Sequence, residues 1–151
     1  MKKMIMIAAL GIATVGMAVA ATAYHLRDDQ PINYQELPAK AQEFVKSYYD
    51  GIEVGYVTMD RDVMSTEYEV VLSDGTKIEF NGDGEWRDID AGRSAVPAAI
   101  VPKELRLYVD EHYAGSDIVE INRDRGGWDV KLSQGLELEF DTAFRLVEID
   151  D

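Results

Sequence analysis

Acidic side chains are the most abundant groups in this sequence that could do chemistry. Asp and Glu number 29, against 15 Lys and Arg, two histidines and no cysteine, and the formal net charge is −14. Without cysteine, thiol catalysis, cysteine-ligated zinc and disulfides are excluded. The negative charge disfavours nucleic acid and anionic membrane surfaces as partners and favours cationic ones.

The sequence contains no recognisable catalytic motif around these acids. Neither Gly-x-Ser-x-Gly nor His-Glu-x-x-His occurs, and no glycine-rich phosphate loop precedes a predicted helix. His25 lies beside a predicted cleavage site, and His112 falls on the apolar stripe of a predicted helix, where we expect it to pack inward. Carboxylates are so numerous that the choice of any two as an acid–base pair carries no information. We therefore predict that the chain is not an enzyme.

The best candidate for a metal site is the segment 81–85. Asn81, Asp83 and Glu85 place oxygen ligands at alternate positions, as at the start of a calcium loop. The distant bidentate glutamate of such a loop is missing at the right spacing, and a plain turn between two strands explains the same residues. Calcium is therefore a candidate ligand, and no other cofactor is expected.

The first 23 residues have the pattern of a signal peptide. Lys2 and Lys3 precede an apolar stretch over 4–19, and the small residues that follow fit an Ala-x-Ala cleavage site. The alternative is an uncleaved anchor, because the apolar stretch approaches the length that spans a bilayer. We expect cleavage, and hence a periplasmic or secreted protein without membrane contact, whose mature net charge is −16. Residues 24–35 show no periodicity and are predicted to be a flexible lead.

The rest of the chain contains one sequence unit twice. With Pro38 aligned on Pro102 and one four-residue gap, 14 identities occur in 47 columns, which indicates a duplicated structural unit. The two units are residues 36–92 and 98–151. Because a unit of about 55 residues is marginal alone, we expect both to share one hydrophobic core.

Each unit begins with a predicted helix and continues with four predicted strands. A Leu-Pro or Val-Pro pair precedes apolar residues at i, i+3, i+4 and i+7, and Gly51 or Gly115 follows the helix. The alternating segments that predict strands are 52–59, 66–73, 76–81 and 85–90, then 117–123, 127–133, 136–141 and 145–150.

The turn at 73–75 determines which side chains of the central hairpin share a face. A two-residue loop would pair apolar Val70 with Glu79, whereas a three-residue loop with its glycine in the left-handed conformation pairs Val70 with Ile78. The corresponding turn at 133–135 gives the same result. The sequence therefore predicts the three-residue loop in both hairpins.

This register places acids directly opposite each other on the solvent side of both hairpins. Glu69 faces Glu79, and Asp129 faces Glu139, although like charges in this position destabilise a hairpin by about 0.2–1 kcal/mol. Their matching positions suggest a site for a basic partner or a cation. The alternative is that arginines of neighbouring strands lie alongside, namely Arg61, Arg87, Arg123 or Arg125. The candidate partner-binding residues are Glu69, Glu79, Lys77, Asp129, Lys131, Glu137 and Glu139.

We predict an α+β fold in which two tandem helix-plus-four-strand repeats share one antiparallel sheet, with both helices on one face. The linker between the units, residues 91–97, is too short for them to lie far apart. The predicted domain is pseudo-symmetric, and its open sheet face carries the opposed acids.

At the level of motifs the chain resembles the PepSY-like periplasmic proteins. The resemblance is carried by a helix that begins at Leu-Pro and ends in Tyr-x-Gly, and by the Ser-x-Gly hairpins at 73–86 and 133–141. It covers about residues 36–151. It implies a tandem fold similar to the β-lactamase-inhibitor protein, in small exported bacterial proteins of mostly unknown function, and it supplies no catalytic residues.

The expected function is non-catalytic binding of a protein or peptide on the exposed sheet face and its loops, with an inhibitor-like role as one form of it. The charge favours a basic partner. The alternative is a small-molecule or calcium-dependent activity at a cleft between the repeats, which requires a deep pocket with converging polar groups.

Overall fold

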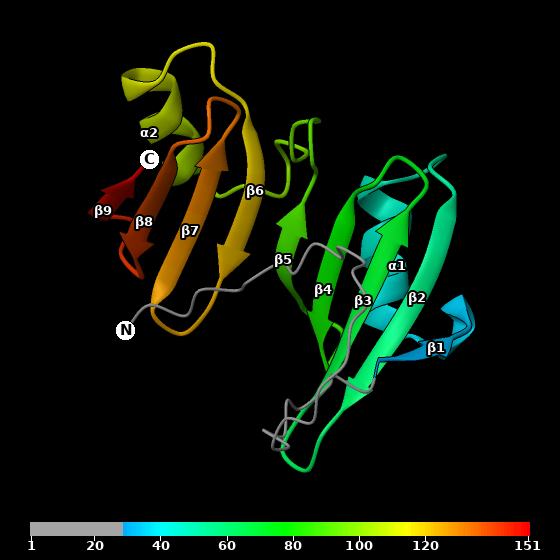
Figure 1. Ribbon diagram of the computed structural model, residues 1–151. Coiled ribbons are helices and arrows are strands. Elements are labelled where there is room, and N and C mark those ends of the chain that lie inside the picture. Colours follow the sequence, from blue (N-terminus) through cyan, green and yellow to red (C-terminus); the bar gives the residue numbers. More distant parts are fainter. Residues whose placement is uncertain (1–28) are drawn as a thin grey trace, which may run out of the picture.

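A computed structural model describes residues 29–151, which form one antiparallel sheet and two α-helices (Figure 1). The nine strands of this region pair in chain order, so that each lies beside its neighbours in sequence. The strands are β1 (Gln30–Ile32), β2 (Val54–Arg61), β3 (Thr66–Leu72), β4 (Lys77–Asn81), β5 (Trp86–Asp90), β6 (Ile118–Arg123), β7 (Gly127–Leu132), β8 (Glu137–Asp141) and β9 (Leu146–Asp150). The helices are a 3₁₀ turn, η1 (Tyr34–Glu36), and the α-helices α1 (Ala39–Tyr48) and α2 (Lys103–His112).

The predicted fold of two helix-plus-four-strand repeats is wrong. The described residues form a nine-stranded sheet with only two α-helices, with 41% of residues in strands and 19% in helices. The additional strand, β1, pairs with residues 57–59 of β2 and lies in the segment predicted to be a flexible lead. A strand of three residues is too short for a detectable alternating pattern. It forms because it provides hydrogen-bond partners along the outer edge of β2.

The N-terminal predictions fall largely outside the described part of the chain. The predicted signal peptide, residues 1–23, and the first part of the lead, residues 24–28, are not described. The rest of the lead forms β1 and η1. Asn33, which caps the start of η1, donates a hydrogen bond from its backbone amide to Glu36 Oε2 at 2.7 Å. Neither α-helix of residues 29–151 has the length and apolar character needed to cross a membrane.

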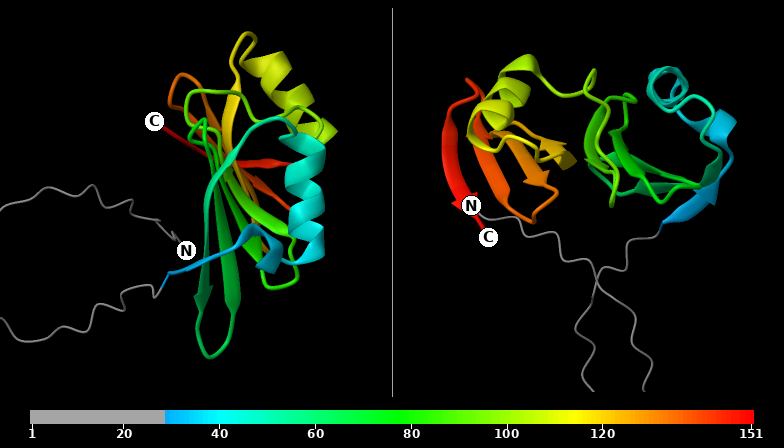
Figure 2. Two further views of the ribbon diagram at one scale, coloured as in Figure 1. Left: turned by 90° about the vertical axis from the view of Figure 1, so that its right-hand side faces the viewer. Right: turned by 90° about the horizontal axis from the view of Figure 1, so that it is seen from above.

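Both α-helices begin directly after a proline and lie on the same face of the sheet (Figure 2). A proline is tolerated at a helix start because its missing N–H would have no partner there. Phe44 of α1 meets the ring of Phe80 edge-on, with 5.7 Å between centroids. Tyr108 of α2 meets Phe140 in the same manner, with 5.1 Å between centroids. Each helix therefore anchors to the sheet through an aromatic contact.

The helix-facing side of the sheet forms one continuous core. Its central row crosses the sheet through directly paired positions: Val57, Val70, Ile78, Ile89, Ile121, Val130, Leu138 and Ile149. All of these are buried except Ile149 on the outermost strand, which is 47% exposed. Because successive side chains of a strand point to opposite faces, the neighbouring rows point away from the helices.

The hairpin registers predicted from the turns are confirmed. Val70 pairs with Ile78 in β3–β4, and Val130 pairs with Leu138 in β7–β8. The glycines of the two turns, Gly75 and Gly135, have φ values of 91° and 95°. This left-handed conformation is the one that a three-residue loop requires.

The inward packing predicted for His112 is wrong. His112 is the last residue of α2, and its side chain is exposed. Its ring stacks on Tyr108, with 4.1 Å between centroids, and Nδ1 lies 3.0 Å from the Tyr108 carbonyl oxygen. The periodicity of the stripe extends to the helix end, but the burial does not.

Candidate functional site

A row of acidic side chains crosses the face of the sheet opposite the helices. Directly paired residues on successive strands form this acidic row: Thr58, Glu69, Glu79, Asp88, Asn122, Asp129, Glu139 and Glu148. Six of the eight are carboxylates. With strands about 4.8 Å apart, the row is roughly 30 Å long. In the part of the chain that the structure describes, both α-helices lie on the other face and leave this one uncovered (Figure 2).

A second row on the same face mixes charges of both signs. It runs through Tyr56, Val71, Lys77, Asp90, Glu120, Lys131, Glu137 and Asp150. Lys131 Nζ lies 3.2 Å from Glu137 Oε1, and this contact raises the pKa of the lysine. The two rows together place all seven predicted partner-binding residues on one face. Only two cations lie among them, so the face is strongly negative.

The acids of the row disfavour one another's ionised forms. Burial raises the pKa of Asp129, and the charges of Glu139, Asp124 and Glu137 raise it further. Like charges have this effect because each ionised neighbour disfavours another negative charge. A cation placed over the row would relieve this repulsion.

Asp88 is the most perturbed carboxyl of the row. It lies on β5, between Glu79 of β4 and Asn122 of β6. Burial raises the pKa of Asp88 to about 7, the charges of Glu120 and Glu79 add to the rise, and a hydrogen bond from the Asn122 side chain opposes it. Its Oδ1 atom is buried and has no hydrogen-bond partner among residues 29–151. The centre of the row therefore favours a proton, or another positive charge, near neutral pH.

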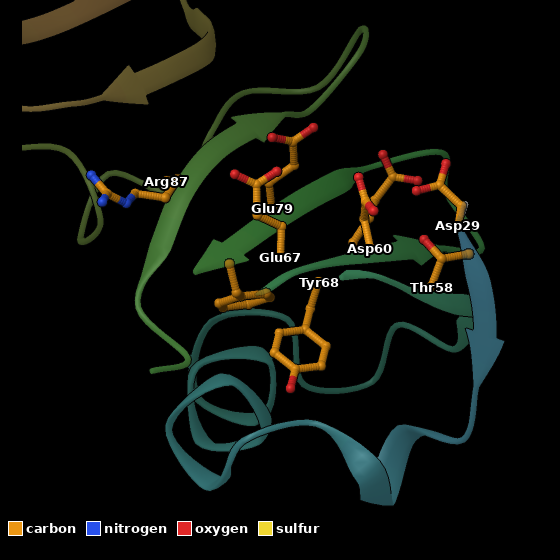
Figure 3. A pocket seen from close by; sticks show the side chains of 9 residues that line it. Asp29, Thr58, Asp60, Glu67, Tyr68, Glu79 and Arg87 are labelled. Atoms are coloured by element: carbon orange, nitrogen blue, oxygen red, sulfur yellow. The ribbon is translucent and has the colours of Figure 1, made fainter. Parts of the chain in front are cut away.

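Two of the arginines offered as an alternative explanation, Arg61 and Arg123, have contacts outside the acidic row. Arg123 lies over the ring of Trp86, with its guanidinium carbon 4.3 Å from the ring centroid, and its Nε donates a 2.7 Å hydrogen bond to the Trp86 carbonyl. The Nη2 atom of Arg61 lies 3.9 Å from the sulfur atom of Met59. Arg87 lines a small cavity near the row, but its guanidinium points away from the Glu79 carboxylate (Figure 3).

That cavity is too small for a typical small-molecule ligand. It has a volume of about 50 Å³ and lies over β2–β5, with lining residues that include Asp29, Thr58, Glu67 and Tyr68. Ligand pockets usually enclose several hundred Å³. Figure 3 shows carboxylates gathered on the open side of the sheet and Tyr68 directed toward α1. The cavity is therefore a shallow part of the acidic face and does not lie between the two predicted units.

The predicted calcium ligands form a capped turn. Asn81 Oδ1 accepts hydrogen bonds from the backbone amides of Asp83 and Glu85, each at 3.0 Å. Glu85 Oε1 lies 3.6 Å from Lys40 Nζ. Within residues 29–151, no group of three or more His, Cys, Asp or Glu side chains is arranged to hold a metal. Calcium binding at these residues stays a prediction.

Four members of the row were not predicted from the sequence: Thr58, Asp88, Asn122 and Glu148. Their positions depend on pairing between different hairpins, above all on the contact of β5 with β6. The alternation of acids with apolar residues in 88–90 and 148–150 was the available signal. This alternation predicts that the acids lie on one side of each strand. It does not predict which strands lie beside one another.

The fold and the face together define a class: a small helix-backed antiparallel sheet with an open acidic side. The family model described as beta-lactamase-inhibitor-like, PepSY-like matches residues 66–148. The chain belongs to this family, as its motifs predict. A comparison with curated proteins yields no match.

Solved structures from Bacteroides are similar to this chain. A periplasmic protein of the DUF2874 family from Bacteroides vulgatus ATCC 8482 is 36% identical, with a TM-score of 0.81, over 83% of this chain and 99% of its own. A protein from Bacteroides thetaiotaomicron, described as calcium-regulated and periplasmic, is 36% identical with a TM-score of 0.79, over 82% and 98%. A third, of unknown function and also from Bacteroides vulgatus ATCC 8482, is 32% identical with a TM-score of 0.78, over 82% and 99%. These relatives are assigned to the periplasm, which confirms the predicted location outside the cytoplasm.

Proposed function

We propose that this protein is a non-catalytic periplasmic binding module that holds a basic protein or peptide against its acidic sheet face. The acidic row is the observation that carries the proposal. Six carboxylates at directly paired positions cost the sheet stability, because adjacent like charges repel. A basic ligand that covers the row offsets this repulsion, because its positive charges attract the carboxylates.

The shape of the face supports a macromolecular ligand. The face is broad, the row is roughly 30 Å long, and the cavity beside it holds only about 50 Å³. An extended segment of about ten residues has the length of the row. Such a surface suits a protein or peptide better than a compact small molecule.

The family description supports one form of this binding. Because the family is described as beta-lactamase-inhibitor-like, the proposed partner includes an exported protein whose activity is blocked while it is held. Charge attraction of this kind accelerates association and weakens with added salt. The proposal therefore predicts salt-sensitive binding.

The test is affinity capture with matched charge variants. The mature protein, the double variant E79K/E139K and the control E104K/E111K are each used to capture proteins from a periplasmic extract, which are identified by mass spectrometry. The control makes the same change in net charge on exposed residues of α2. We expect basic proteins to be retained by the wild type and the control and lost by E79K/E139K. Equal retention by all three would reject the acidic face as the binding site.

Calcium-dependent binding is a second candidate function. It is favoured by the Bacteroides thetaiotaomicron relative described as calcium-regulated and by the predicted ligands Asn81, Asp83 and Glu85. The test is a calorimetric titration of calcium into the mature protein and into D83A/E85A. Saturable heat that is lost in the variant supports the candidate. No heat at millimolar calcium removes it and leaves the acidic-face proposal unaffected.

A further inference from the structure

The two edges of the sheet differ in their protection against an added strand. An exposed edge offers unpaired backbone N–H and C=O groups, and natural proteins block it with short strands, prolines or charges. The edge formed by β1 is only three residues long and has Pro31 at its centre, so it lacks one amide donor. The edge formed by β9 has five residues and contains neither proline nor glycine. The charges of Glu148 and Asp150 protect the β9 edge, so it is open to backbone pairing with a strand that these charges do not repel.

Apolar side chains on β9 are exposed for lack of a neighbouring strand. Ile149 pairs with Leu138 in the core row, as Ile89 pairs with Ile78. Ile89 is fully buried, whereas Ile149 is 47% exposed. The difference is that Ile89 also pairs with Ile121 of β6, and no described strand lies beyond β9. Val147 on the same strand is 61% exposed. A strand with an apolar residue beside Ile149 would extend the core row.

The charges on β9 determine what kind of strand can fit. Glu148 ends the acidic row, Asp150 ends the second row, and both are exposed. A second copy of the chain paired at this edge would bring such acids beside one another, which opposes self-association. Lys or Arg residues at the same positions of an added strand would instead pair with them. The edge is thus complementary to a segment in which basic and apolar residues alternate.

We infer that β9 binds an extended partner segment of alternating basic and apolar residues as a tenth strand. The added strand makes backbone hydrogen bonds to the free edge, places its apolar side chains beside Ile149 and places its basic side chains beside Glu148 and Asp150. Strand addition of this type obtains affinity from the backbone and selectivity from alternate side chains. This inference rests on the proposed function and deepens it, because it assigns the position and conformation of one segment of the basic partner, at the Glu148 end of the acidic row.

The test uses synthetic peptides of defined chemistry. Fluorescein-labelled capped hexapeptides are titrated with the mature protein and followed by fluorescence anisotropy. The first alternates Lys and Val, the second is the same peptide with alternate backbone nitrogens methylated, and the third alternates Glu and Val. Methylation keeps the charge and removes hydrogen-bond donors along one edge. Because the methylated peptide lacks the donors for these backbone hydrogen bonds, we expect it to bind at least about tenfold more weakly. The Glu–Val peptide should not bind.

Protein variants and hydrogen exchange locate the binding. Replacement of an edge charge, E148K, should weaken binding of the Lys–Val peptide about three- to fivefold. The control E111K, with the same charge change on α2, should remain within about twofold of the wild type. Amide exchange in residues 146–150 should slow when the Lys–Val peptide is bound.

The outcomes separate this inference from the proposed function. Equal binding of the methylated and unmethylated peptides, with loss in E79K and none in E148K, would overturn strand addition and retain binding on the acidic face. Unchanged exchange in 146–150 would also overturn it. Absence of Lys–Val binding together with equal capture by E79K/E139K would reject both.

Discussion

Asp88 and Asn122 lie directly opposite each other where β5 meets β6, at the centre of the acidic row. The two strands belong to different hairpins and are separated by α2 in sequence. The Asn122 side chain is the only neutral neighbour of Asp88 in the row, because Glu79 lies on its other side. Burial, followed by the charges of Glu120 and Glu79, makes Asp88 the carboxyl with the most strongly raised pKa in the row.

Asp88 should make the protein less stable as the pH rises. Its pKa is raised to about 7 in the folded protein, above the ordinary value of 3.8. The unfolded chain therefore loses this proton more readily, so the free energy of unfolding falls between about pH 4 and pH 7 and then levels off. We expect D88N to be more stable than wild type at pH 8 by up to about 4 kcal/mol, and equal to it near pH 4.

Chemical denaturation at pH 8, 6 and 4 checks this prediction. D110N, on an exposed position of α2, serves as a control that removes one carboxylate without touching the row. A D88N protein whose stability follows the same pH curve as wild type would contradict the account of Asp88.

Relief of like-charge repulsion should stabilise the sheet. Glu139 lies opposite Asp129 and raises its pKa. E139K places a lysine opposite that aspartate, and we expect the free energy of unfolding to increase by about 0.5–1 kcal/mol. Urea denaturation at low and high salt measures the gain, which should shrink at high salt. A loss of stability in E139K would show that the row is not internally repulsive.

Gly127 should tolerate no side chain. Its φ is 146°, and a Cβ atom would lie 1.9 Å from the carbonyl oxygen of Phe140 on the paired strand. We expect G127A to lose about 3 kcal/mol or more, because backbone atoms must move apart. Gly135 is the matched control, since its φ is 95° but nothing lies within 4 Å of the added atom. G135A should lose about 1 kcal/mol, and thermal unfolding compares the two.

Removal of the Tyr49 hydroxyl should stabilise the protein. Tyr49 is buried, and its hydroxyl has no hydrogen-bond partner in the described part of the chain. Burial, followed by the charge of Asp74, raises its pKa. Because an unpaired buried hydroxyl carries a desolvation cost, we expect Y49F to gain about 1 kcal/mol. The comparison is Y113F, at a partly exposed position, which should change little. A destabilised Y49F would mean that the hydroxyl has a partner in solution.

Local patterns predicted much of this structure. The hairpin registers follow from turn length and strand alternation, both of which act within about fifteen residues, and so Glu69–Glu79 and Asp129–Glu139 were placed correctly. The pairing of β5 with β6 could not be obtained in this way, because it joins two edges that are distant in sequence. Asp88 therefore escaped notice, although it is the most perturbed acid of the face.

Two errors have different physical origins. β1 was missed because three residues carry no pattern, and its stability comes from the free edge of β2. His112 was predicted to be buried because helical periodicity shows which side of the helix faces the sheet. It does not show how far along the helix the sheet extends, and His112 is exposed. The partner and calcium predictions stay open to the experiments above.

The chain-ordered pairing of the strands has a consequence for assembly after export. A polypeptide that crosses a membrane N-terminus first delivers β1 to β9 in the order in which they pair. Each strand that emerges after β1 docks on a strand that has already arrived, and the contacts within each hairpin are local and form quickly. The last strand to arrive, β9, is also the strand whose free edge we infer to bind the partner segment.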